Sequence, residues 1–283
     1  MVENIPRHPF PTGNAGEGLA VLRENARELV DGLEAGSTNL GDALGTTLIL
    51  AQAHCLMDAR ASSYPTWDAW VTAMQVGSAA FAAATTTEDH VQCRIAHKDR
   101  TLRATGPQWY TNPAAWLNAF YLAVVCREKE RITALCQVPL SLLRENGSGF
   151  EEHHYAWIDT LQTYWLGGQD LVQKLVAAVD GTDPEAVADP ATVNRLLYPP
   201  MEMFHRFIRK DNAGFNQALH NALRWHKDYW SEEDHAFQIS GLVALAPLAI
   251  ACMAYDADMP VEVESDYLPR ALLDRSWVGE YDT

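Results

Sequence analysis

The apolar residues of this chain recur with the period of an α-helix over most of its length. One stripe occupies positions 116, 117, 120, 121, 124 and 125, all of which fall on a single helical face. The same spacing recurs within residues 157–165 and 215–229. Closer to the start, residues 15–33, 40–57 and 67–84 show the pattern again, and the loop sequence SSYPT separates the last two. The pattern predicts a mainly α-helical protein.

Residues 90–105 break this helical period. Val91, Cys93 and Ile95 alternate with polar residues before a charged turn, which is the period of a half-buried strand. We therefore expect one small β-hairpin near residues 90–105. A further short strand is expected at residues 261–264, directly after Pro260.

A coarse repeat organises the second half of the chain. Apolar helical segments end near residues 126, 166, 209 and 255, roughly forty residues apart, and a polar turn follows each one. This spacing predicts an irregular stack of helical hairpins similar to an α-solenoid, with a helical bundle as the alternative. No Gly/Ser-rich linker divides the chain, so we expect one helical domain over residues 1–283, with residues 1–13 as an extended N-terminal arm.

The most apolar stretch, residues 241–255, is shorter than the roughly 20 residues that cross a bilayer, and Pro247 interrupts it. We expect a buried, kinked core helix there and no association with a membrane. The proline-rich start contains no apolar run that would serve as a secretory signal, so a cytoplasmic location is expected. Five cysteines without a CxxC pair are interpreted as reduced thiols.

The charge of the chain restricts its partners. Its 37 acidic and 21 basic residues give a formal net charge of −16, which disfavours nucleic acid and favours a basic partner.

Three Glu-x-x-His spacings offer the best hint of enzymatic chemistry. Glu151 with His154 and Glu202 with His205 each share a helical face, as in the di-iron sites of four-helix bundles, and Glu232 with His235 repeats the spacing. The apolar segments lack the isolated glutamates that would complete such a cage. The sequences HExxH, GxSxG, GxGxxG and GxxxxGK[ST] are also missing, so no catalytic residues and no cofactor are expected.

Two segments carry residues suited to protein binding. Trp109 and Tyr110 lie in a proline-bounded loop, where they either anchor a partner or cover the hairpin. The acidic stretch that follows the last long apolar segment would attract a basic partner. Its candidate contact residues are Asp256, Asp258, Glu262, Glu264, Asp266 and Tyr267.

Several long phrases resemble the immunity protein 49 family of actinobacterial polymorphic-toxin systems. The resemblance runs from RHPFPTGNA to SDYLP and is carried by TWDAWVTAMQVGSAAFAAAT, ATGPQWYTNPAAWLNAFYLAVVCREKERI, DTLQTYWLG, LYPPMEMFHRFIRKDNAGFNQAL and PLAIACMAYDADMPVEVESDYLP. It implies a nearly all-helical cytoplasmic antitoxin that binds and blocks a cognate toxin. The acidic charge adds the expectation that this toxin is basic, for example a nuclease. The alternatives are a helical metal-dependent enzyme, a small-molecule-binding self-resistance protein, and a homodimeric interaction protein.

Overall fold

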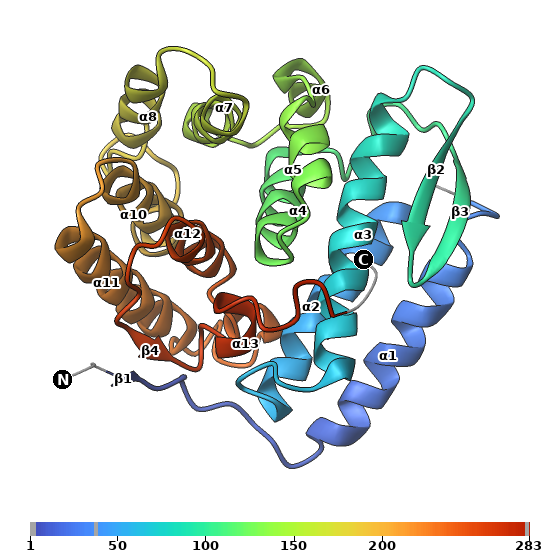
Figure 1. The fold of residues 1–283 in the computed structure, drawn as a ribbon, viewed down its shortest axis with the longest axis horizontal. Helices are drawn as coiled ribbons and strands as arrows, with labels where there is room; N and C mark the ends of the chain where they lie inside the picture. Colours follow the sequence, from blue (N-terminus) through green and yellow to red (C-terminus); the bar gives the residue numbers. More distant parts are fainter. Residues whose placement is uncertain (1–3, 37–38, 281–282) are drawn as a thin grey trace.

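The structure is a computed structural model that describes residues 4–36, 39–280 and 283. Helices make up most of it, and the strands form two small two-stranded sheets within the described residues (Figure 1). The longer helices are α1 (Ala15–Asp31), α2 (Leu40–Met57), α3 (Tyr64–Thr85), α4 (Pro113–Val125), α5 (Lys129–Cys136), α7 (Glu152–Leu166), α8 (Leu171–Asp180), α10 (Tyr198–Ile208), α11 (Asn212–Trp230) and α12 (Leu245–Asp256). The shorter ones are α6 (Leu140–Glu145), α9 (Pro190–Thr192), α13 (Arg270–Leu273), the π-helix η2 (Val193–Leu197) and the 3₁₀-helix η3 (Ile239–Gly241). The predicted mainly α fold is confirmed.

The predicted β-hairpin is also confirmed. Strands β2 (His90–Ile95) and β3 (Lys98–Arg103) pair antiparallel, with Ile95 opposite Lys98. The two turn residues, Ala96 and His97, both have positive φ angles, as a two-residue turn with the twist of a hairpin requires. The hairpin lies on the outer side of α3 (Figure 1).

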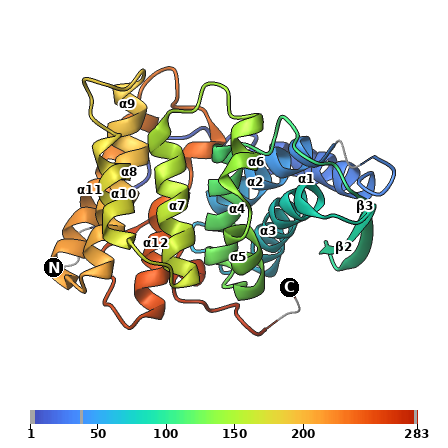
Figure 2. The same cartoon turned by 90° about the horizontal axis from the view of Figure 1, so that it is seen from above.

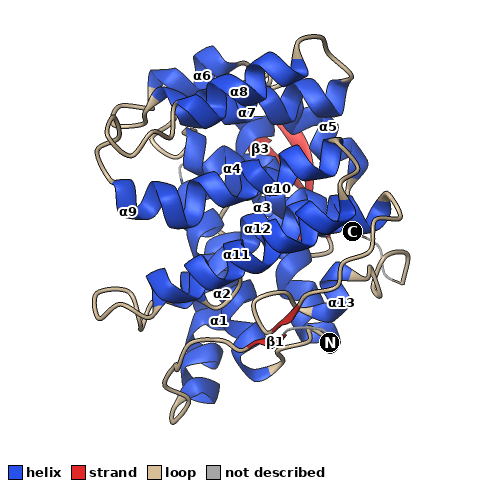
Figure 3. Cartoon of the chain, turned by 90° about the vertical axis from the view of Figure 1, so that its left-hand side faces the viewer, coloured by secondary structure: helices blue, strands red, loops and turns tan. Residues whose placement is uncertain are grey.

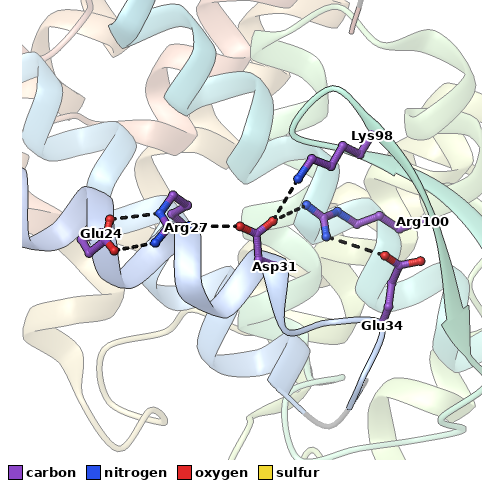
Figure 4. Close-up of polar contacts among 6 residues, drawn as sticks. All are labelled: Glu24, Arg27, Asp31, Glu34, Lys98 and Arg100. Carbon is purple, nitrogen blue, oxygen red and sulfur yellow. Dashed lines mark hydrogen bonds and ion pairs between the residues drawn. The ribbon is translucent and has the colours of Figure 1, made fainter.

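A chain of ion pairs fastens helix α1 to this hairpin (Figure 4). The guanidinium of Arg100 is buried and lies 3.0 Å from Asp31 and 3.9 Å from Glu34. Lys98 reaches the same Asp31 carboxylate at 3.4 Å. These contacts join segments about seventy residues apart in sequence and hold the end of α1 against the hairpin.

The other side of the molecule is built from helix pairs joined by short turns. Helix α7 packs on α8, and α10 packs on α11, which agrees with the predicted hairpins. Helix α12 then lies inside this arc and contacts α4, α10 and α11 (Figures 1 and 2). Because this last long helix fills the centre, the helices close on themselves as an irregular bundle instead of extending as an open stack.

Helix α12 corrects the expected kinked helix at residues 241–255. The α-helix begins only at Leu245, so Pro247 lies in its first turn, where a missing N–H costs no helical hydrogen bond. Ile239–Asp256 is long and apolar enough to cross a membrane by length and composition, but 72% of it is buried inside the fold. We therefore describe it as a core segment.

The N-terminal segment joins the far end of the chain. Strand β1 (Asn4–Ile5) pairs parallel with β4 (Glu264–Ser265), so the strand expected at residues 261–264 begins only at its last residue. Arg7 continues this junction by donating to the carbonyls of Cys55, at 3.0 Å, and Asp266, at 2.6 Å. Residues 1–3 of the expected arm lie outside the described residues.

Candidate protein-binding site

Of the two aromatic residues expected in a binding loop, only one is exposed. Trp109 retains 61% of its accessible surface, whereas Tyr110 retains 3%. The rings meet edge to face at 5.5 Å, and both cover Gly41, where an added Cβ would lie 2.6 Å from the indole. Tyr110 therefore belongs to the core, and Trp109 alone presents a free face.

The acidic segment after α12 is divided in a similar way. Tyr267 is fully buried, and Asp256 is paired with Arg127 at 3.1 Å and with Arg275 at 3.7 Å. The remaining predicted carboxylates are exposed, namely those of Asp258, Glu262, Glu264 and Asp266. These four remain candidate contact residues, whereas Tyr267 is a core residue.

The two predicted segments also lie apart. Trp109 covers Gly41 at the beginning of α2, while Arg7 links Asp266 to Cys55 near the end of the same helix. With 14 positions between residues 41 and 55, the helix separates them by about 21 Å. The residues predicted for toxin binding therefore do not form one continuous patch.

The Glu-x-x-His pairs do not assemble into a metal cage. Glu202 accepts a hydrogen bond from Arg206 at 2.8 Å and lies 3.9 Å from Nδ1 of His205. The Glu151 carboxylate accepts a hydrogen bond from the backbone N–H of Ala188 at 2.9 Å. No three His, Cys, Asp or Glu side chains of the described chain gather in a geometry that holds a metal ion. The di-iron hypothesis therefore loses its structural basis in residues 4–36 and 39–280.

A cleft of about 270 Å³ is lined by residues of α2, α4, α7, η2, α10, α11, η3 and α12. We call it the central cleft. Most of its lining is apolar or aromatic, including Leu48, Leu117, Trp157, Leu196, Pro200 and Val243. A concave apolar site of this kind, with a few polar groups, is the usual form of a binding pocket.

The end of α11 builds one wall of the central cleft. The indole of Trp230 packs directly on Gly241, where a Cβ would lie 2.6 Å from the ring. His226, one turn earlier, has its Nε2 3.0 Å from the Gly241 carbonyl. Burial lowers the pKa of His226 to about 3, so the neutral ring donates this hydrogen bond. Gly241 thus fixes both side chains.

Two buried polar groups of the cleft have no hydrogen-bond partner in the described chain. Gln52 is 4% exposed and its Oε1 accepts no hydrogen bond, while Trp230 is 8% exposed and its Nε1 donates none. Both residues line the central cleft. Because nearly all buried polar groups in proteins are satisfied, this pair gives the cleft one acceptor and one donor that a bound group can use.

The π-helix η2 forms another part of the lining through Leu196 and Leu197. Its cause lies in the sequence, because Pro199 and Pro200 have no N–H to donate four or five positions back to the carbonyl of Arg195. That carbonyl therefore has no helical donor. Single π turns of this type are frequent at functional sites.

His154 contributes a polar edge from the first turn of α7. Burial, and next to it the neighbouring His153, lower the pKa of His154 to about 4, so the ring is neutral at pH 7. Its Nδ1 lies 3.2 Å from the Glu151 carbonyl, which assigns the proton to Nδ1 and leaves Nε2 as an acceptor. This residue lines the central cleft instead of serving the predicted metal pair.

An acidic surface borders the central cleft. The loops before α9 and after α11 lie at the same edge of the helical body (Figure 3). Tyr229 and Thr192 join them through a 3.2 Å hydroxyl contact, and Arg195 pairs with Glu232. Residues 180–189 and 231–240 contain no Lys or Arg. Their carboxylates, which we call the acidic rim, are Asp180, Asp183, Glu185, Asp189, Glu232, Glu233 and Asp234.

The acidic rim also carries an exposed aromatic ring. Phe237 retains 69% of its surface on the loop after α11. The EEDH sequence of this loop, which contains Glu232 and His235, forms turns, whereas the similar EEHH sequence begins α7. The signal that sequence reasoning missed was the density of acidic residues in two segments 50 positions apart, which only the fold brings together.

Comparison with known protein families identifies one family that this chain matches. The sequence model of a family described as immunity protein 49 matches residues 58–272. These residues include every helix that lines the central cleft except α2, and both loops of the acidic rim. No match to a curated protein or to a solved structure was found.

Proposed function

The chain belongs to the immunity protein 49 family, and we propose that it is a non-catalytic antitoxin that binds and neutralises a cognate protein toxin. The family match over residues 58–272 carries this proposal. Neutralisation by binding requires a surface of defined chemistry and no reaction. The acidic rim, Phe237 and the central cleft offer such a surface on one side of the molecule.

Charge supports a basic toxin, such as a nuclease. The net charge of −16 and the acidic rim attract a basic surface over the range of a Debye length, which raises the association rate at low salt. Affinity then comes from a few well-packed aromatic or apolar contacts that exclude water. We propose that such a toxin is met in the cytoplasm, where an acidic antitoxin with free, mostly buried cysteines functions.

Co-purification tests this function. The tagged protein is produced with the product of the neighbouring gene and purified at about 50 mM and about 200 mM salt, and native mass spectrometry identifies what is bound. The proposal expects a stoichiometric complex with a basic protein that weakens at the higher salt. A chain that elutes alone or only as a homodimer at both salt concentrations contradicts it.

A further inference from the structure

We propose that the central cleft receives one large aromatic side chain of the toxin, and that this side chain projects from a Lys/Arg-rich segment lying along the acidic rim. The inference rests on the proposed antitoxin function and names the contact that the toxin makes.

The size of the cleft favours a single side chain. Its volume of about 270 Å³ is below the range of roughly 300–1,000 Å³ typical of pockets for drug-sized ligands. Its walls include Trp157 and Trp230, against which a ring packs edge to face or offset. Protein interfaces concentrate their energy in pockets of this kind, each filled by a Trp, Tyr or Arg of the partner.

The unsatisfied groups define the polar part of the occupant. Gln52 Oε1 needs a donor, and Trp230 Nε1–H needs an acceptor. Since both are more than nine-tenths buried, leaving them unpaired costs free energy that a bound group recovers. A tyrosine offers a donor and an acceptor in one hydroxyl on an apolar body, and this is the side chain that fits best.

The rim defines what surrounds that side chain. Seven carboxylates occur in residues 180–189 and 231–240, these two segments contain no Lys or Arg, and Arg195 of the π-helix pairs with Glu232. An anionic border of this kind complements Lys or Arg side chains on both sides of the inserted ring and repels an acidic segment.

The test uses the toxin co-purified with the wild-type chain as the probe in surface plasmon resonance. Ala114→Trp and Ser240→Trp place a bulky ring at two exposed positions that line the cleft, so the core is left intact. We expect each to weaken binding by about tenfold or more through faster dissociation. Ala20→Trp, at an exposed position of α1, is the matched control and should bind like the wild type.

A second variant set tests the rim. Charge reversal of Asp183, Glu185, Glu233 and Asp234 to Lys should slow association by about tenfold at low salt and by much less at high salt. The same reversal of Asp258, Glu262, Glu264 and Asp266 is the matched control, because it changes the net charge equally, and it should slow association clearly less than the rim set if the rim is the docking surface. If both sets slow association equally, the acidic rim is not the docking surface.

The outcomes separate the two proposals. Wild-type toxin affinity in both cleft variants overturns the cleft inference while the antitoxin function stands. A wild-type chain that binds no toxin overturns both. Native mass spectrometry of the purified chain tests a third outcome. A small molecule that binds the wild type and is lost in Ala114→Trp would show that the occupant of the cleft is not a protein side chain.

Discussion

The hydroxyl of Tyr267 lies 2.8 Å from Nδ1 of His8 and 2.8 Å from its backbone nitrogen. Residues 259 positions apart are thus joined inside the core. Burial raises the pKa of Tyr267 to about 12, so the neutral phenol donates to the ring and accepts from the backbone N–H. This contact explains why a tyrosine in an acidic segment, which the sequence suggests as a binding anchor, instead fixes the N-terminal segment to the body of the protein.

We predict that Tyr267→Phe destabilises the fold. The change leaves the buried N–H and ring nitrogen of His8 without a partner, at a cost of about 1–3 kcal/mol. Urea denaturation followed by circular dichroism measures the loss. Tyr255→Phe is the control, because the Tyr255 hydroxyl makes no hydrogen bond within the described chain. Equal stability of both variants would show that the His8 contact contributes nothing.

Two glycine substitutions should change stability in opposite directions. At Gly241 an added Cβ meets the Trp230 ring at 2.6 Å, so Gly241→Ala should cost about 1–3 kcal/mol. Gly45 lies within α2 and is exposed, with nothing within 4 Å of an added Cβ. Gly45→Ala should therefore stabilise the protein by about 0.5–1 kcal/mol. Melting temperatures measure both changes, and a tolerated Gly241→Ala would contradict the packing described for the cleft wall.

Stability should fall as the pH is lowered from 7 to 5. The pKa values of His226 and His154 are about 3 and about 4 in the fold, against about 6.5 in the unfolded chain. Below pH 6.5 the unfolded chain therefore binds protons that the folded chain does not, so the free energy of unfolding decreases with falling pH. We expect about 1–2 kcal/mol for each histidine between pH 7 and 5. Urea titrations at the two pH values measure it, and equal midpoints would exclude neutral, buried rings.

The hairpin should depend on one carboxylate of α1. Asp31→Ala removes the closest partner of the buried Arg100 guanidinium and should destabilise the protein by about 1–2 kcal/mol. Glu24→Ala removes an exposed pair with Arg27 and should leave the melting temperature nearly unchanged. If the two variants have the same melting temperature, the ion pairs of Figure 4 do not stabilise the fold.

Sequence periodicity predicted the helices and the hairpin, because these elements depend on residues close together in the chain. The periodicity of α2 placed its ends at Leu40 and Met57, where the structure has them, and strict alternation found the hairpin of β2 and β3. Proline chemistry was harder to interpret, since Pro247 suggested a kink and instead occupies a first helical turn. The π-helix that precedes Pro199 and Pro200 was not predicted from the sequence.

The site depends on distant contacts, and these were not predictable. Asp256 resembles a free carboxylate in sequence, but Arg127, 129 positions earlier, pairs with it. The central cleft combines residues from α2 to α12, with Gln52 and Trp230 as its unsatisfied groups. Periodicity shows that such residues are buried, and it contains no information on which of them face one another.

Titration of toxin activity with the purified protein tests the central claim most directly. The toxin co-purified with the chain is separated, its activity is measured, and the protein is added back in increasing amounts. An antitoxin that acts by binding should reduce the activity in proportion to its concentration and abolish it near one equivalent. Full activity in the presence of excess protein would contradict the antitoxin function, and loss of activity at amounts far below one equivalent would show that the protein acts as an enzyme.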